Sequence, residues 1–134
     1  MQTRTFWLEV DDGAKLFVHC WEPDAGLPKA AVQIAHGMAE HSARYARVAQ
    51  RLTSAGYVVY ANDHRGHGKT AAKPEDLGFF AAHDGFRRVV RDMVALSERI
   101  AQEHASNGTA PALRGGASGL PLFLMGHSMG SLFT

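Results

Sequence analysis

A serine framed by two glycines lies near the end of the sequence. Residues 126–130 read GHSMG and match the pattern G-x-S-x-G, with Ser128 at the centre. The apolar run 121–125 (PLFLM) comes directly before the motif, and a helix is expected to begin at Ser128. In that context the pattern forms a sharp, strained turn that exposes the serine hydroxyl above a sheet. The glycines allow a turn that is too tight for side chains at those positions. Ser128 is therefore predicted to be a nucleophile that attacks an acyl carbon.

A second part of such a site follows an earlier apolar run. His36 and Gly37 come after residues 30–35 (AAVQIA), at the strand end where α/β sheets build their sites. Hydrolases with this serine motif stabilise the oxyanion with the N–H after the nucleophile and an N–H from the loop after the earlier strand. The predicted donors are the amides of Met129 and Met38. We interpret the His36 side chain as a structural support of the loop, and place His36 and Gly37 as candidate substrate-binding positions at the rim.

Two other kinds of site are disfavoured by residue spacing. Residues 68–70 (GKT) end like a phosphate-binding loop, but that motif needs a glycine where Asp63 stands. The eight histidines form no H-E-x-x-H motif, and His64 and His67 lack the cysteine or carboxylate spacing typical of zinc. We therefore expect no nucleotide, metal or other cofactor. Residues 63–68 (DHRGHG) are interpreted as a turn after a strand, held by polar contacts.

The elements that must position these residues alternate between strands and helices. Two runs rich in β-forming residues, 5–10 and 15–21, are joined by Asp12-Gly13, which is a strong hairpin signal. Buried strands are predicted at 30–35, 57–61 and 121–125, helices from Ala43 (capped by Ser42) to Gly56 and from Asp84 (a candidate N-cap) to His104, and loops at 62–80 and 105–120. This alternation predicts parallel pairing with right-handed crossovers.

The predicted fold class is α/β: a mostly parallel sheet with an N-terminal β-hairpin and helices on both faces. In the strand order that is usual for α/β sheets with this serine motif, strand 121–125 pairs with strand 30–35 on one side. Its other side is expected to be an open apolar edge, which is a site for aggregation or for a complementing partner.

The composition is that of an ordinary globular domain. The 134 residues are 46% hydrophobic and 20% charged, with a formal net charge of +1, so we expect no attraction to nucleic acid. The single cysteine, Cys20, excludes a disulfide within the chain and is interpreted as a small core residue. No signal peptide and no apolar run long enough to span a membrane are found, so a cytoplasmic location is expected.

Three separated motifs together resemble one family. Residues 36–45 (HGMAEHSARY), 63–68 (DHRGHG) and 126–130 (GHSMG) resemble the monoacylglycerol lipases and lysophospholipases of the α/β-hydrolase fold, a group that shares the serine aminopeptidase (S33-type) domain. The resemblance implies that Ser128 is the nucleophile, that the Met38 and Met129 amides form the oxyanion hole, and that the substrates are lipid-like esters with one acyl chain. Ser131 stands where many members carry glycine, and a small packing difference is expected there.

The resemblance also implies parts that this sequence does not contain. In this fold the nucleophile is followed along the chain by an acid and then by a histidine. Only six residues follow Ser128, and none is acidic or a histidine. The cap of the family, through which transient contact with a membrane surface is expected, also comes later. Residues 1–134 are therefore predicted to be a partial α/β-hydrolase domain, truncated after the turn that carries Ser128.

Several alternatives remain open from the sequence. The chain could be non-catalytic, or one half of a split enzyme that needs a complementing partner. A peptidase, a thioesterase or a cofactor-free haloperoxidase could use the same serine turn. His127 is not expected to replace the missing base, because its side chain should diverge from the hydroxyl of the adjacent Ser128.

Overall fold

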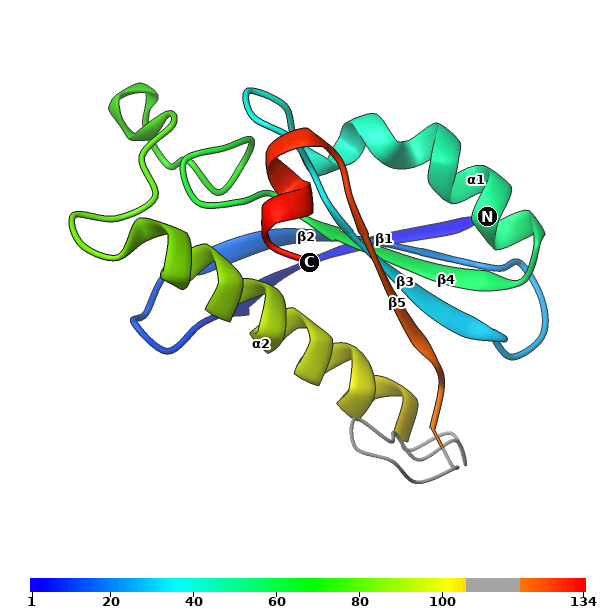
Figure 1. Cartoon of the computed structure of the whole chain (residues 1–134). Coiled ribbons are helices and arrows are strands. Elements are labelled where there is room, and N and C mark those ends of the chain that lie inside the picture. The colour runs from blue at the N-terminus through cyan, green and yellow to red at the C-terminus, as the bar shows by residue number, and fades with distance from the viewer. Residues whose placement is uncertain (106–118) are drawn as a thin grey trace.

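One mixed sheet organises the part of the chain that the structure describes. The structure is a computed structural model that describes residues 1–105 and 119–134 (Figure 1). Its strands are β1 (Gln2–Glu9), β2 (Lys15–Glu22), β3 (Ala30–Ala35), β4 (Tyr57–Asn62) and β5 (Leu122–Gly126). Their order across the sheet is β1-β2-β4-β3-β5. Most of the predicted loop at 105–120 lies outside the described residues.

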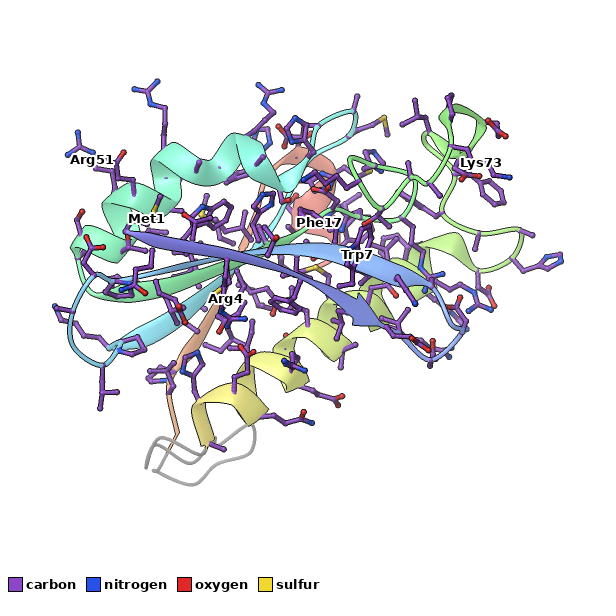
Figure 2. The ribbon with its side chains drawn as sticks, turned by 180° about the vertical axis from the view of Figure 1, so that it is seen from behind. Met1, Arg4, Trp7, Phe17, Arg51 and Lys73 are labelled. Carbon is purple, nitrogen blue, oxygen red and sulfur yellow. The ribbon has the colours of Figure 1, made fainter. Side chains whose placement is uncertain are left out.

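The N-terminal hairpin is confirmed. Strands β1 and β2 are antiparallel, with Gln2 opposite Glu22 at one end of the ladder. The turn uses Gly13 at a φ of +80°, which a glycine adopts without steric cost. Figure 2 views the sheet from the side on which β1 lies in front, where Trp7 and Phe17 are cross-strand partners whose rings meet edge to face with centroids 5.3 Å apart.

The parallel part of the sheet is β4-β3-β5. Strand β3 pairs in parallel with both neighbours, whereas β2 joins the outer side of β4 in the antiparallel sense. The predicted pairing of β5 with β3 is thus confirmed. Parallel strands are covered on both faces, which explains why β3 is buried along its whole length and why its sequence shows no polar alternation.

Helices cover the two faces of the sheet, as predicted. Helix α1 (Ala46–Ser54) and helix α2 (Gly85–Ala105) lie on opposite sides in Figure 1. Alternate side chains of β4 divide between them: Val58 packs with Leu96 of α2, while Val59 packs with Ala49 of α1. Both helices therefore bury an apolar face on the same strand and fix its orientation.

The starts of the helices differ from the sequence-based expectation. A 3-10 helix, η1 (Ser42–Tyr45), precedes α1, so the helix predicted from Ala43 begins with a tighter turn. Ser42 does not cap it, because its N–H and its hydroxyl both donate to Oδ1 of Asp63, at 2.7 and 2.5 Å. Asp84 precedes α2 as predicted, with its carbonyl accepting the Arg88 N–H, but its φ of +54° lies in the left-handed region, which aspartate tolerates.

The outer edge of β5 is open in the described residues, as the sequence predicted. Phe123 is 56% exposed and Leu124 is 48% exposed. Strand β5 is the last strand in the sheet order and pairs only with β3, whereas β3 is paired on both sides and buried along its whole length. Within the described residues, no helix combines the length and apolarity that crossing a membrane requires.

Candidate active site

Ser128 lies at a strained turn directly after β5. Its φ is +52°, in the left-handed region that costs a residue other than glycine about 1–3 kcal/mol. Ser128 also begins the 3-10 helix η3 (Ser128–Leu132), which the i→i+3 bond from Gly130 N–H to His127 carbonyl closes. The strand, turn and helix predicted around the motif are therefore present, with a 3-10 helix as the last of the three.

Both glycines of the motif lie so close to neighbouring backbone that no side chain fits at either position. A Cβ atom on Gly126 would lie 2.4 Å from Cα of Ser131, and one on Gly130 would lie 2.1 Å from the carbonyl oxygen of Ala35. The same Ala35 carbonyl accepts the N–H of His127 at 3.1 Å. The turn is thus pressed against the end of β3. Ser131, where a glycine is common in the resembling family, donates its hydroxyl to the Ser128 carbonyl at 2.6 Å.

The loop after β3 lies next to this turn. A Cβ on Gly37 would lie 3.1 Å from Nδ1 and 3.3 Å from the carbonyl oxygen of His127. Ala39 in the same loop has a φ of +57°. Strained backbone of this kind persists where the surroundings enforce it and clusters at active sites. The structure therefore brings together the loop that contains Met38 and the turn that contains Ser128 and Met129, which lie about 90 residues apart in the sequence.

His36 is fully buried beneath this loop. Its Nε2 accepts the N–H of His64 at 2.9 Å, so Nδ1 carries the proton and donates to the carbonyl of Gly37 at 2.7 Å. Burial lowers the pKa of His36, and this neutral tautomer fits both contacts. The imidazole therefore supports the loop, as interpreted from the sequence, and is not exposed at the rim.

Residues 63–68, after β4, form the turn held by polar contacts that the sequence predicted. The carboxylate of Asp63 accepts the N–H of Lys69 at 2.7 Å in addition to its two bonds from Ser42. The carbonyl of Asp63 accepts the hydroxyl of Thr70 at 2.8 Å. A Cβ on Gly68 would lie 2.2 Å from the Asp63 carboxylate, so the close approach of this carboxylate requires a glycine at this position.

Glu40 is a residue of the site that the sequence analysis missed. Its side chain is only 8% exposed. Its Oε1 accepts the N–H of Gly37 at 2.5 Å, the hydroxyl of Tyr45 at 2.7 Å and a contact from Nδ1 of His127 at 3.1 Å. The spacing of Gly37 and Glu40 is that of a capping box, but residue 37 is glycine and no helix begins there, so the sequence offered no clear signal for this contact.

Electrostatics keep Glu40 ionised. Burial alone would raise its pKa, but the hydrogen bonds from Tyr45, Gly37 and His127 stabilise the carboxylate and lower the pKa to about 2. Burial, followed by the hydrogen bond to Glu40, raises the pKa of the Tyr45 hydroxyl. The imidazole of His127 is directed at Glu40, with Nδ1 3.1 Å from Oε1.

A pocket of about 420 Å³ opens beside Met38. Its walls come from residues 38–41 on one side and from residues 66–68 and 77–78 on the other. The Met38 side chain is 71% exposed and Leu77 is 64% exposed. An apolar group could therefore lie next to the predicted oxyanion donor. In the described part of the chain, no group of three or more histidine, cysteine or acidic side chains is placed to hold a metal ion.

The sheet order, the helices on both faces and a left-handed serine between β5 and the following helix together define an α/β hydrolase. Residues 26–134 match the family described as Serine aminopeptidase, S33, and the chain belongs to this family.

Similar proteins agree with this assignment. The chain is 35% identical to the monoglyceride lipase of Homo sapiens over 119 residues, and 37% identical to the monoacylglycerol lipase of Mycolicibacterium smegmatis over 121 residues. These matches cover 89% and 88% of the chain, but only 33% and 35% of the two relatives. A solved structure described as a lipase in an open form is similar with a TM-score of 0.77 at 31% identity, over 97% of this chain and 37% of that one. The chain thus spans about a third of the length of these two curated relatives.

Proposed function

We propose that this chain supplies the nucleophile and the oxyanion-hole amides of a serine hydrolase that cleaves carboxylic esters of the monoacylglycerol or lysophospholipid type. The observation that carries the proposal is the left-handed Ser128 at the end of β5, next to the loop that contains Met38. The names of the similar lipases and the apolar pocket beside Met38 support a lipid-like ester with one acyl chain as substrate.

The proposed reaction proceeds through an acyl-enzyme. The Ser128 oxygen attacks the ester carbonyl carbon and gives its proton to a histidine base. The N–H groups of Met38 and Met129 stabilise the negative charge on the former carbonyl oxygen, and each such donor is worth about 10²–10³ in rate. The alkoxide leaves with the proton from the histidine, and water then releases the acyl group by the same steps. Neither an acid nor a histidine follows Ser128 in this sequence, and in the proposed reaction both are supplied by polypeptide other than residues 1–134.

A chimera tests the proposal directly. Residues 1–134 are joined to the part of the Mycolicibacterium smegmatis lipase that follows the segment matched by this chain. We expect the chimera to hydrolyse a monoacylglycerol and a short-chain p-nitrophenyl ester. Ser128→Ala should lower kcat by at least about 10⁴-fold, because the serine and its base act as a unit. A fluorophosphonate probe should label Ser128 in the chimera, as read by mass spectrometry of the labelled peptide.

The controls are the chain alone and the lipase part alone, which should both be inactive. A folded chimera, as judged by circular dichroism, that hydrolyses neither ester contradicts the proposal. So does a chimera whose activity survives Ser128→Ala.

A second candidate is a half-enzyme that works with a separate partner, and the open apolar edge of β5 favours it. Mixing residues 1–134 with the lipase part as two separate polypeptides tests this candidate. Activity that appears only on mixing supports it, whereas activity that requires covalent fusion argues against it.

A further inference from the structure

We propose that Glu40 is a positioning residue that holds the two proposed oxyanion donors at a fixed separation; this inference rests on the proposed function. Glu40 would not touch the substrate. It would act through the two segments that carry the amides of Met38 and Met129, by bonding to both of them at once.

The contacts of Glu40 divide between these two segments. On one side, its Oε1 accepts the N–H of Gly37, the residue directly before Met38, at 2.5 Å. On the other side, the same oxygen lies 3.1 Å from Nδ1 of His127, two residues before Met129. One carboxylate oxygen therefore links positions that are about 90 residues apart in the sequence, as a side chain that spans two loops can.

The carboxylate is itself anchored to the core. Tyr45 donates its hydroxyl to Oε1 at 2.7 Å, and its ring is buried in the cluster that packs α1 on the sheet. The Tyr45 ring also meets the His127 ring, with centroids 6.5 Å apart. Arg44 lies 3.6 Å from the second oxygen, but it is 64% exposed, so this ion pair is screened by solvent. Tyr45 is therefore the anchor, and Arg44 contributes little.

The packing leaves little freedom to the linked segments. A Cβ on Gly37 would lie 3.0 Å from Oε1 of Glu40 and 3.1 Å from Nδ1 of His127, so the three groups are already at contact distance. Because an oxyanion donor acts on charge that develops in the transition state, a shift of about 1 Å in its position can cost about 10²-fold in rate without weakening substrate binding. Removal of Glu40 should thus affect kcat more than KM.

The first test uses residues 1–134 alone and does not depend on activity. Amide hydrogen exchange is followed by NMR in the wild type, in Glu40→Ala and in the control Glu75→Ala, whose side chain is exposed in the short helix at 74–76. Loss of a hydrogen bond to a carboxylate should speed exchange of the Gly37 amide by about 10- to 100-fold. The amide resonances of Met38 and Met129 should both shift, and Glu75→Ala should change none of them.

The second test uses the active chimera. We expect Glu40→Ala to lower kcat by about 10- to 100-fold with KM changed less than about threefold. Binding of a boronic acid that mimics the tetrahedral intermediate should weaken in parallel with kcat. Glu40→Gln, which keeps an acceptor oxygen, should retain more activity than Glu40→Ala, and Tyr45→Phe should fall between Glu40→Gln and the wild type. These conservative variants keep the test valid if Glu40→Ala does not fold.

The outcomes separate the positioning role from the proposed function. An unchanged Gly37 amide in Glu40→Ala overturns the positioning role, whether or not the chimera is active. A chimera that loses activity with Ser128→Ala but keeps full kcat with Glu40→Ala and Glu40→Gln also overturns it, and leaves the proposed function standing. A rise in KM with kcat unchanged assigns Glu40 to substrate binding and likewise overturns it.

Discussion

At the scale of single residues, the fold lowers the pKa of buried histidines such as His36 and His64. His64 is fully buried, and burial, followed by the nearby His36 and His67, lowers its pKa to about 3. Its backbone N–H is bound by His36, while its Nε2 has no partner among the described residues. Protonation of His64 would place a charge between two other imidazoles without a counter-charge. The folded protein therefore requires the neutral ring.

Acid should accordingly destabilise the protein through His64. Because the folded pKa lies below the unfolded value of 6.5, this contribution is complete above pH 6.5 and is lost as the pH falls from 6.5 towards 3. One proton changes the free energy of unfolding by about 1.4 kcal/mol per pH unit in that window. His64→Gln should reduce the slope of stability against pH between 6 and 4.5 by about that amount. Urea unfolding at several pH values measures it.

The slope, and not the absolute stability, is the informative quantity, since any substitution at a buried position lowers stability. His83→Gln provides the control, because His83 is exposed in the segment before α2. An equal slope in the wild type and in His64→Gln would contradict the assignment.

At the scale of elements, Arg65 joins three parts of the fold. Its guanidinium makes two bonds to Asp92 of α2, at 2.7 and 2.8 Å, and two to Asp12 of the β1–β2 turn, at 2.7 and 2.9 Å. Asp92 is 1% exposed and Arg65 is 9% exposed. The ion pair between Arg65 and Asp92 is therefore desolvated. The two-bond contact depends on the planar guanidinium, which only arginine has.

Breaking this pair should be costly. Asp92→Ala leaves the Arg65 charge buried and only partly paired, so we expect a loss of about 3–5 kcal/mol in the free energy of unfolding. Arg65→Lys should also destabilise, because lysine cannot make the two-bond contacts. Arg88→Ala is the matched control: Arg88 also pairs with Asp12, but it is 33% exposed, and we expect a loss below about 1 kcal/mol. Urea denaturation measures these free energies of unfolding. Equal losses in Asp92→Ala and Arg88→Ala would contradict the expectation that the buried pair contributes more than the exposed one.

The elements were predictable where local signals determine them. The Asp12-Gly13 turn, the apolar strands β3 and β4, and the apolar face of α2 follow from turn chemistry and periodicity. The contacts of Arg65 with Asp92 and Asp12, and that of Glu40 with His127, were not predictable, because these partners lie 27 to 87 residues away and no local pattern selects them. The predicted start of α1 was wrong for the same reason, because Ser42, which was predicted to cap the helix, donates its hydroxyl to Asp63.

At the scale of the whole molecule, the described sheet has two edge strands, β1 and β5, and the edge at β5 is the apolar one. Strand β5 ends the sheet, and Phe123 and Leu124 on it are about half exposed. An exposed apolar edge strand favours pairing with other chains. The serine turn at the end of the same strand was predictable from its motif, whereas the degree of exposure required the arrangement of the whole sheet.

Residues 1–134 should therefore self-associate as the concentration rises. We expect Leu124→Lys to reduce this association, because a charged residue on an edge strand opposes pairing. Leu27→Lys is the control, since Leu27 is 72% exposed but lies in the loop between β2 and β3. Light scattering after size-exclusion chromatography measures the effect. A chain that stays monomeric at all concentrations, or that responds equally to both variants, would show that the edge is not the contact surface.

The carbonyl of Ala35, which binds the His127 amide and touches Gly130, has a consequence for how this chain can be engineered. Through these contacts, the register of β5 against β3 determines where Ser128 lies relative to the end of the sheet. Inserting one residue into β5 would advance the serine by about 3.3 Å and turn each later strand side chain to the opposite face. Length changes inside this strand are thus far more damaging than substitutions at its outer edge, and chimeric junctions belong outside residues 122–130.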